Sequence, residues 1–216
     1  MASEPEPPAD RQPPRRGRPH GAARATGDAE PPTAGWRGDV ERVDVAVYAA
    51  IAQTPTPALD RAMARLSDAA DRSRLSFAAA ALLAAAGGGE GRRAAGRGVA
   101  SIAVTSAVVN LVLKPLRRRP RPDRAAEQVP LARHVRMPRS TSFPSGHAAS
   151  AFAFSTGVGH VLPGAAIPLR GLAAVVAYSR VHTGVHYPAD VIAGALIGTT
   201  LAQLTSQLLD RRTGAR

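Results

Sequence analysis

The sequence contains no cysteine among its 216 residues. Disulfides, thiolate metal ligands and a cysteine nucleophile are therefore excluded, and the redox compartment stays open. Aromatic residues are also scarce, at 4% of the chain. The apolar content of 44% consequently rests on Ala, Val and Leu, so any membrane helices are expected to be only weakly hydrophobic.

Lysine is almost absent, because Lys114 is the single lysine among 28 basic residues. The net charge of +12 raises the question of nucleic-acid binding. However, the arginines are not interleaved with aromatic residues for base stacking, and no helix-turn-helix or zinc pattern is found. Roughly half of the cations fall in the N-terminal tail and in one loop. We therefore expect no nucleic-acid partner and attribute much of the charge to a compositional bias toward Arg.

The first part of the chain differs in composition from the rest. Residues 1–38 are rich in Pro, Gly, Arg and acidic residues and have almost no large apolar side chains, which predicts a disordered tail. No apolar segment follows the charges of this tail, so we do not expect a cleavable signal peptide. The sequence thus predicts one helical domain over residues 39–210, followed by a short C-terminal tail over residues 211–216.

Apolar segments fill the predicted domain. Residues 40–48 and 59–70 predict short pieces that are interfacial or face the core, separated by prolines. Uncharged stretches rich in small residues follow, as expected of helices that pack closely within membranes. They are Leu75–Gly88, Val99–Leu113, Phe152–Ile167, Gly171–Tyr178 and Val191 to about Leu204.

These stretches predict the fold class. We expect an all-α, multi-pass transmembrane bundle of about five to six helices in the cell membrane, although several stretches are shorter than the ~20 residues of a typical span. A soluble Ala-rich bundle is the alternative. If each of the last four stretches crosses the bundle once, the ends marked by Lys114, Ser145, Ser179 and Pro188 lie on one face.

The first polar cluster on that face is the segment from Lys114 to Pro122, which reads KPLRRRPRP. Lys114 ends a predicted helix, where a cation meets the negative end of the helix dipole. The prolines stiffen the path that follows, so Arg121 is held at a set distance from Lys114. The alternative is a solvated basic loop or a lipid-headgroup contact, which is how we interpret Arg117, Arg118 and Arg119.

The second cluster opens the segment STSFPSGHAASAFAF, residues 140–154. Proline, a serine able to cap and a glycine precede an apolar run, which predicts a helix N-terminus with free N–H groups that bind anions. His147 lies in the first turn, where it can exchange a proton with a bound anion. An ordinary cap with an incidental surface histidine is the alternative.

The third cluster runs from Ser179 to Asp190. His182, His186 and Asp190 are spaced by four residues, which suggests a metal site, but Pro188 argues against their sharing one helical face. We therefore expect no metal. Asp190 in the first turn of the next helix can instead fix the tautomer of His186 and raise its nucleophilicity, or it can simply interact with the helix dipole.

Taken together, the clusters supply two histidines, one supporting carboxylate, an anion-binding helix end and three cations. This set suits phosphoryl transfer without a metal or other cofactor: cations and N–H groups bind the phosphate oxygens, one histidine attacks, and the other protonates the leaving oxygen. The three cations are Lys114, Arg121 and Arg180.

The same residues resemble the three signature motifs of the type 2 phosphatidic acid phosphatase (PAP2) superfamily, from Lys114 to about Leu204. The resemblance implies a helical bundle in which His186 forms a phosphohistidine, Asp190 orients it, and His147 acts as general acid and then as base. It also implies a set of phosphate-binding residues: Lys114, Arg121, Ser145, Gly146 and Arg180.

The expected function is therefore a metal-independent phosphatase for a lipid or polyprenyl phosphate or diphosphate. Phosphatidate, phosphatidylglycerol phosphate, undecaprenyl diphosphate and a polyprenyl-linked sugar phosphate all fit. The alternatives are a soluble acid phosphatase, a vanadium haloperoxidase-like enzyme, and a non-enzymatic basic protein that binds membranes or nucleic acid. Arginines flank both sides of the bundle, so the family resemblance alone favours a site facing away from the cytoplasm.

Overall fold

The computed structural model describes residues 35–214. The disorder expected of residues 1–38 lies outside the described residues except at its end, where helix α1 (Trp36–Gln53) begins. Every regular element in the described part is a helix or a helical turn, which confirms the all-α class.

Short turns separate the helices along the chain, except for the long loop between α5 and α6. Prolines mark the first position of three of them, at Pro57, Pro163 and Pro188, where a missing N–H leaves no hydrogen bond unmade. After α1 the elements are α2 (Pro57–Ala69), η1 (Asp71–Ser73), α3 (Arg74–Ala86), α4 (Gly88–Val108), the π-helical turn η2 (Val109–Leu113), α5 (Lys114–Leu116), η3 (Leu131–Arg133), α6 (Gly146–Gly159), α7 (Pro163–His182) and α8 (Pro188–Thr213).

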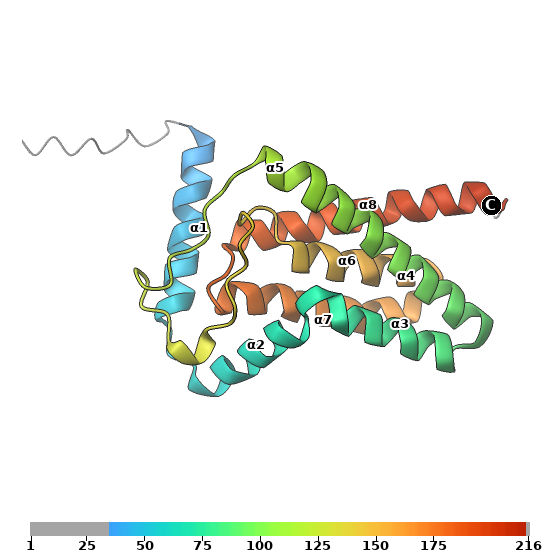
Figure 1. Cartoon of the computed structure of the whole chain (residues 1–216), viewed down its shortest axis with the longest axis horizontal. Coiled ribbons are helices and arrows are strands. Elements are labelled where there is room, and N and C mark those ends of the chain that lie inside the picture. The colour runs from blue at the N-terminus through green and yellow to red at the C-terminus, as the bar shows by residue number, and fades with distance from the viewer. Residues whose placement is uncertain (1–34, 215–216) are drawn as a thin grey trace, which may run out of the picture. The chain divides into compact units, whose positions relative to one another are not determined.

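Helix α6 is the centre of the bundle. It packs most extensively against α8, α4 and α7, while α3 covers α4 (Figure 1). The first residues of α6 and α8 and the last residues of α7 lie at the same end of the bundle, beneath the long loop that follows α5 (Figure 1). The bundle therefore gathers two helix N-termini and one helix C-terminus at one end.

Small residues set the distance between the central helices. A Cβ atom on Gly198 of α8 would lie 2.1 Å from the carbonyl oxygen of Ala149, and one on Gly157 of α6 would lie 2.5 Å from Ser101 Oγ. Both separations are far below van der Waals contact, so these positions admit only glycine at the present spacing. The composition rich in small residues thus has the packing consequence that was predicted for it.

Two of the predicted helical stretches have the wrong boundaries. The predicted stretch Phe152–Ile167 is interrupted, because α6 ends at Gly159 and α7 begins at Pro163. The predicted stretch Gly171–Tyr178 extends in both directions to become the whole of α7. The turn between the helices consists largely of apolar residues, so hydropathy alone did not reveal it.

Two helices in the described part are long and apolar enough to cross a membrane, namely Gly88–Leu116 and Pro188–Arg212. This is fewer than the five to six spans expected from the sequence. The larger number of spans stays a prediction. Each of the two candidate spans has one terminus at the end of the bundle where α6 and α8 begin and α7 ends.

A buried arginine holds the long loop against the first two helices. Arg133 is fully buried, and it donates hydrogen bonds to Asp60 at 2.8 Å and to the carbonyl oxygens of Ile51 at 2.9 Å and Thr54 at 2.6 Å. His182 Nε2 at the end of α7 lies 3.0 Å from the same Asp60 carboxylate. The loop, α2 and α7 are consequently joined by one buried polar network.

The glycine contacts predict opposite effects for two matched substitutions. Gly198→Ala must push α8 away from α6, and overpacking of this kind destabilises a protein by about 1–3 kcal/mol. Gly171→Ala in α7 places its Cβ in open space and removes a flexible helix residue, which stabilises by roughly 0.5–1 kcal/mol. Thermal unfolding of the detergent-solubilised protein should show a lower midpoint for Gly198→Ala and an unchanged or higher midpoint for Gly171→Ala. A Gly198→Ala variant as stable as the parent would contradict the packing.

Candidate active site

The turn that follows α7 brings Arg180 and His186 together. The N–H groups of Val185 and His186 both donate to the carbonyl oxygen of Arg180, each at 3.1 Å. Gly184 in this turn has a φ of 67°, in the left-handed region that glycine adopts without strain. The Thr-Gly pair between His182 and Val185 is therefore what folds the chain back so that both side chains serve one site.

The two ring nitrogens of His186 have different surroundings. Nδ1 lies 3.5 Å from Asp190 Oδ2 and 3.4 Å from Ser142 Oγ. Nε2 lies 3.2 Å from NH1 of Arg121, and a guanidinium can only donate. Nε2 must therefore accept this hydrogen bond, which places the ring proton on Nδ1, next to Asp190. The lone pair of Nε2 is the nucleophilic one, and it faces Arg121.

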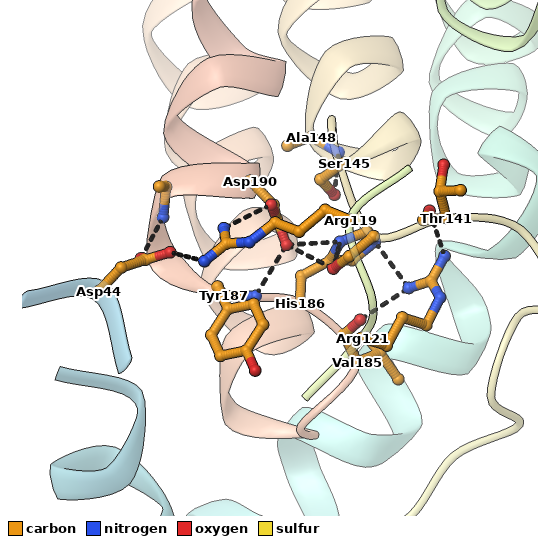
Figure 2. Close-up of polar contacts among 12 residues, drawn as sticks. Asp44, Arg119, Arg121, Thr141, Ser145, Ala148, Val185, His186, Tyr187 and Asp190 are labelled. Atoms are coloured by element: carbon orange, nitrogen blue, oxygen red, sulfur yellow. Dashed lines mark hydrogen bonds and ion pairs between the residues drawn. The ribbon is translucent and has the colours of Figure 1, made fainter. Parts of the chain in front are cut away.

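Asp190 is fully buried and carries more partners than the sequence indicated (Figure 2). Its Oδ1 accepts from Arg119 at 2.9 Å, and its Oδ2 accepts from Ser142 Oγ at 2.5 Å and from the Tyr187 N–H at 3.0 Å. The last contact caps the first turn of α8. A carboxylate bound in this way keeps both its charge and its orientation toward His186.

The interpretation of Arg119 as a solvated or headgroup-contacting residue is wrong. Its side chain is only 14% exposed, and it pairs with Asp44 at 2.7 Å as well as with Asp190. The guanidinium also lies over the ring of Tyr187, 4.2 Å from the centroid. By contrast, Arg117 and Arg118 are exposed, as the sequence predicted. Figure 2 shows Arg119 between the two carboxylates.

Lys114 and Arg121 are joined through one serine. Ser140 Oγ lies 3.2 Å from Lys114 Nζ and 3.3 Å from NH2 of Arg121. Arg121 is further fixed by hydrogen bonds to the carbonyl oxygens of Ser140 at 2.9 Å, Thr141 at 3.2 Å and Val185 at 2.6 Å. The stiff segment between the two cations thus ends in an arginine that is held at several points, with Nε2 of His186 beside it.

The start of α6 has the cap that the sequence predicts. The side chain of Ser145 accepts from the Ala148 N–H at 3.5 Å, and its own N–H donates to the carbonyl oxygen of Asp190 at 2.9 Å. A Cβ on Gly146 would lie 3.8 Å from Lys114 Nζ, so the first N–H groups of α6 and the lysine border the same space. A cleft of about 240 Å³ is lined by Lys114, Gly146 and His147 there.

His147 and Arg180 each present a buried nitrogen that makes no hydrogen bond within the described structure: Nε2 of His147 and Nε of Arg180. His147 Nε2 lies 3.4 Å from Asp71 Oδ1, where the carboxylate would stabilise the imidazole once it is protonated. Arg180 is 3% exposed and donates from NH1 to Ser67. Buried polar atoms without partners are uncommon and point to a ligand that would satisfy them.

The electrostatics favour an anion. Within residues 35–214, no ion pair joins Lys114, Arg121 or Arg180 to a carboxylate. Asp190, the carboxylate that acts on Arg121, is already paired with Arg119, and Asp71 and Asp68 act on Arg180 without forming an ion pair with it. Three cations and the positive end of α6 therefore act together on the space in front of His186, where a tetrahedral oxyanion can be bound.

Burial keeps both histidines neutral. Burial is the main reason that the pKa of His186 is lowered to about 4; Asp190 opposes this shift, and the nearby Arg121 and Arg180 contribute to it. Burial likewise lowers the pKa of His147, which lies ahead of the apolar stretch of α6, to about 3, with Arg180 and His186 adding to the effect and Asp71 opposing it. An incoming phosphate reverses this balance at His147, because its negative charge favours the imidazolium.

All eight residues selected from the sequence lie at this end of the bundle, and the structure adds four more. Ser140 and Ser142 lay within the quoted motif segment, but nothing in the sequence distinguished them from the other serines. No feature of the sequence indicated that Asp71, which approaches His147, or Arg119 belongs to the site. The eight are Lys114, Arg121, Ser145, Gly146, His147, Arg180, His186 and Asp190.

His182 belongs to a different network from His186. Its Nε2 faces Asp60, and its Nδ1 lies 3.3 Å from the hydroxyl of Tyr178. His182 is therefore explained by the buried network around Arg133, although it lies four residues before His186 in the sequence.

Comparison with known proteins agrees with the family resemblance of the sequence. The model of the PAP2 superfamily matches residues 95–214. The chain is 35% identical over 114 residues to the decaprenylphosphoryl-5-phosphoribose phosphatase of Mycobacterium tuberculosis, which covers 53% of this chain and 61% of the relative. It is 41% identical over 75 residues to the undecaprenyl-diphosphatase of Sulfolobus acidocaldarius, or 33% of this chain and 35% of that protein.

A solved structure has the same fold. The transmembrane PAP2-type phosphatidylglycerolphosphate phosphatase from Bacillus subtilis superposes with a TM-score of 0.63 at 24% identity, over 80% of this chain and 87% of that one. The chain spans about three fifths of the length of the first curated relative that it matches.

The contacts of Arg119 predict that it is required for activity although it does not face the anion site. Arg119→Ala leaves two buried carboxylates unpaired, and breaking a buried pair in this way typically costs about 3–5 kcal/mol. We expect a loss of phosphate release of at least about tenfold at saturating substrate. Arg118→Ala, which removes the same charge from the exposed neighbour, is the matched control and should retain activity. Equal activities of the two variants would refute the positioning role.

The pKa of His186 predicts an acid-sensitive fold. Because its pKa falls from the usual 6.5 to about 4 on folding, the neutral imidazole contributes full stability above about pH 6.5, and this is lost as the pH falls toward about 4. The loss attributable to His186 is at most about 3 kcal/mol. Denaturant unfolding of the parent and of His186→Gln at several pH values should show a shallower decline for the variant. Parallel curves would contradict the burial of a neutral His186.

Proposed function

The chain belongs to the PAP2 superfamily, and from this we propose that it is a metal-independent phosphatase acting on a lipid or polyprenyl phosphate. The proposal places the phosphatase domain within residues 39–210. One observation carries it: the neutral His186, oriented by Asp190 through Nδ1, presents Nε2 to a space bordered by three cations without carboxylate partners. This is the arrangement that in-line attack on a phosphate requires.

In the first step, the phosphate takes the N–H of Arg121 that Nε2 of His186 accepts in the free protein. Nε2 then attacks phosphorus, and the bond from phosphorus to the leaving oxygen breaks. His147 donates its proton to that oxygen, so the alcohol leaves uncharged and His186 carries the phosphoryl group. Asp190 stabilises the positive charge that develops on the imidazole through the proton on Nδ1.

In the second step, His147 is neutral and acts as a base. It removes a proton from a water molecule whose oxygen attacks phosphorus, and the bond from phosphorus to Nε2 breaks. Inorganic phosphate and the original His186 are the products, and His147 again carries the proton for the next cycle. The one imidazole thus serves as acid and then as base, in keeping with its position beside the site and apart from the nucleophile.

The remaining site residues bind the phosphate oxygens in this proposal. Lys114, Arg121 and Arg180 supply positive charge, and the first N–H groups of α6, after the cap at Ser145 and beside Gly146, supply oriented donors. The protein therefore provides, with its own side chains, the charge that a metal ion supplies in other phosphoryl-transfer enzymes.

A lipid substrate is favoured by the surface of the bundle. Large apolar side chains point outward on the two candidate spans, including Leu111 and Leu116 near the end of one and Ile192 and Leu196 near the start of the other. An exposed apolar surface of this kind is typical of contact with acyl chains. A phosphate at this end of the bundle can reach the site while its lipid chain stays in the bilayer, and we place the site on the side facing away from the cytoplasm.

The test is phosphate release by purified, detergent-solubilised protein from a panel of lipid and polyprenyl phosphates with EDTA present. We expect activity that EDTA does not reduce, and His186→Ala should lower it by about 10³-fold or more because the covalent route is lost. Reactions with ³²P-labelled substrate, quenched with denaturant at alkaline pH where a phosphohistidine is stable, should label the parent and His147→Ala but not His186→Ala. Full activity of His186→Ala, or activity that depends on an added metal, would refute the mechanism.

A further inference from the structure

A polar cleft of about 380 Å³ lies next to the candidate active site. Arg180, which binds the phosphate in the proposed mechanism, forms part of its wall, and so does Asp71, whose carboxylate approaches His147. The cleft therefore begins at the general acid and at a phosphate-binding cation, which is where the leaving oxygen of the substrate must lie. Its other charged residues are Asp68, Arg136 and Arg139.

Both walls of this cleft are anchored to arginines of the site. One wall, at the end of α2, is fixed by hydrogen bonds from Arg180 to Ser67. The other wall, residues 136–139, is held at both ends: Arg124 donates to the carbonyl oxygen of Val135 at 2.9 Å, and Arg121 donates to that of Ser140 at 2.9 Å. The cleft is thus a built feature of the site, with its geometry coupled to the groups that bind phosphate.

The charged side chains in the cleft do not neutralise one another. Within residues 35–214, no ion pair or hydrogen bond is formed by the side chains of Asp68, Arg136 or Arg139, and Arg74 contacts only the backbone carbonyl of Asp68. Acceptors and donors of opposite charge, kept apart in this way, suit a ligand that has both hydroxyl groups and a negative charge.

A second cleft at His147 is apolar and much smaller. It lies between α3, α6 and α7, is lined by residues such as Leu75, Phe154 and Val176, and has a volume of about 20 Å³. One water molecule needs about 10–15 Å³ on the same measure, so this cleft holds little more than that. The other cleft at His147, of about 240 Å³, is bordered by polar groups that include Asp71, Asn110 and Lys114. Neither space beside His147 is therefore a roomy apolar channel for a prenyl or acyl chain attached directly to the reacting phosphate.

We propose that the polar cleft is a leaving-group subsite for a sugar that carries a second anionic group. In this inference, which rests on the proposed function, Asp68 and Asp71 accept hydrogen bonds from sugar hydroxyls, and Arg136 and Arg139 bind the second anion. The substrate class is a sugar phosphate whose ring is also bonded to another phosphate group, either a phosphodiester to a lipid or a free phosphate.

The two carboxylates make a diphosphate less suitable as substrate. In a diphosphate the leaving group is itself a phosphate, and it would lie against Asp71 at the start of the cleft. Like charges at this distance repel, whereas a sugar hydroxyl donates to a carboxylate. The phosphate-binding residues would accept any of these lipid phosphates, whereas the cleft favours a sugar leaving group over a phosphate leaving group.

The test compares kcat/KM for four substrates in detergent: a pentose phosphate joined through a phosphodiester to a polyprenyl chain, ribose 1,5-bisphosphate, a polyprenyl monophosphate and a polyprenyl diphosphate. We expect the two sugar substrates to exceed the other two. Arg136→Ala should lower the ratio of kcat/KM between lipid-linked sugar phosphate and polyprenyl monophosphate by about tenfold, because a charge-assisted contact is lost. Preference between the two sugar substrates identifies which source of the second anion the cleft serves.

Arg92→Ala is the matched control, since this exposed arginine lies at the other end of α4. It should leave the ratio unchanged, and Asp68→Asn should lower it. A ratio that Arg136→Ala leaves unchanged, including the case in which it weakens all lipid substrates alike through a headgroup contact, would overturn the subsite. Preference for the polyprenyl monophosphate or diphosphate would do the same. Failure of the parent to release phosphate from any substrate would instead refute the proposed function.

Discussion

The ion pair between Arg119 and Asp190 decides how charge is distributed in the site. Without it, the carboxylate that supports His186 would attract Arg121, the nearest cation of the site, and the positive charge available to a ligand would fall. Because Arg119 and Asp44 form a separate buried network with Asp190, the carboxylate orients the imidazole and the other cations stay available. Arg119 thus neutralises the carboxylate that orients His186, and the other cations of the site remain available to bind an anion.

The packing of the helices also positions the groups of the site. Close approach at Gly198 and Gly157 brings α6 against α8 and α4, so the capped start of α6 lies beside the first turn of α8, which carries Asp190. The backbone contact from the Ser145 N–H to the carbonyl oxygen of Asp190 joins the two helix starts directly. The small residues inside the bundle therefore make possible the polar contacts at the end of the bundle where the site lies.

The sequence predicted the helical class and the gathering of the eight selected residues at one end of the bundle, because prolines, glycine and histidine at fixed spacing carry strong local constraints. It failed where the constraint is tertiary. The break between α6 and α7 lies within apolar residues and leaves no mark in hydropathy. Arg119 looks like its neighbours Arg117 and Arg118 in sequence, and only the folded chain places Asp44 and Asp190 beside it. The number of spans and the roles of the site residues stay predictions.

The hydrogen bond from Arg121 to Nε2 of His186 gives the resting protein a form of chemical protection. While the guanidinium occupies the lone pair, an uncharged electrophile that diffuses into the site meets an imidazole that is already engaged. An anion competes for the same guanidinium and so uncovers the nitrogen as it binds. In the proposed mechanism, reactivity toward adventitious acylating or alkylating agents is thereby held back until a phosphate arrives and frees Nε2 for attack.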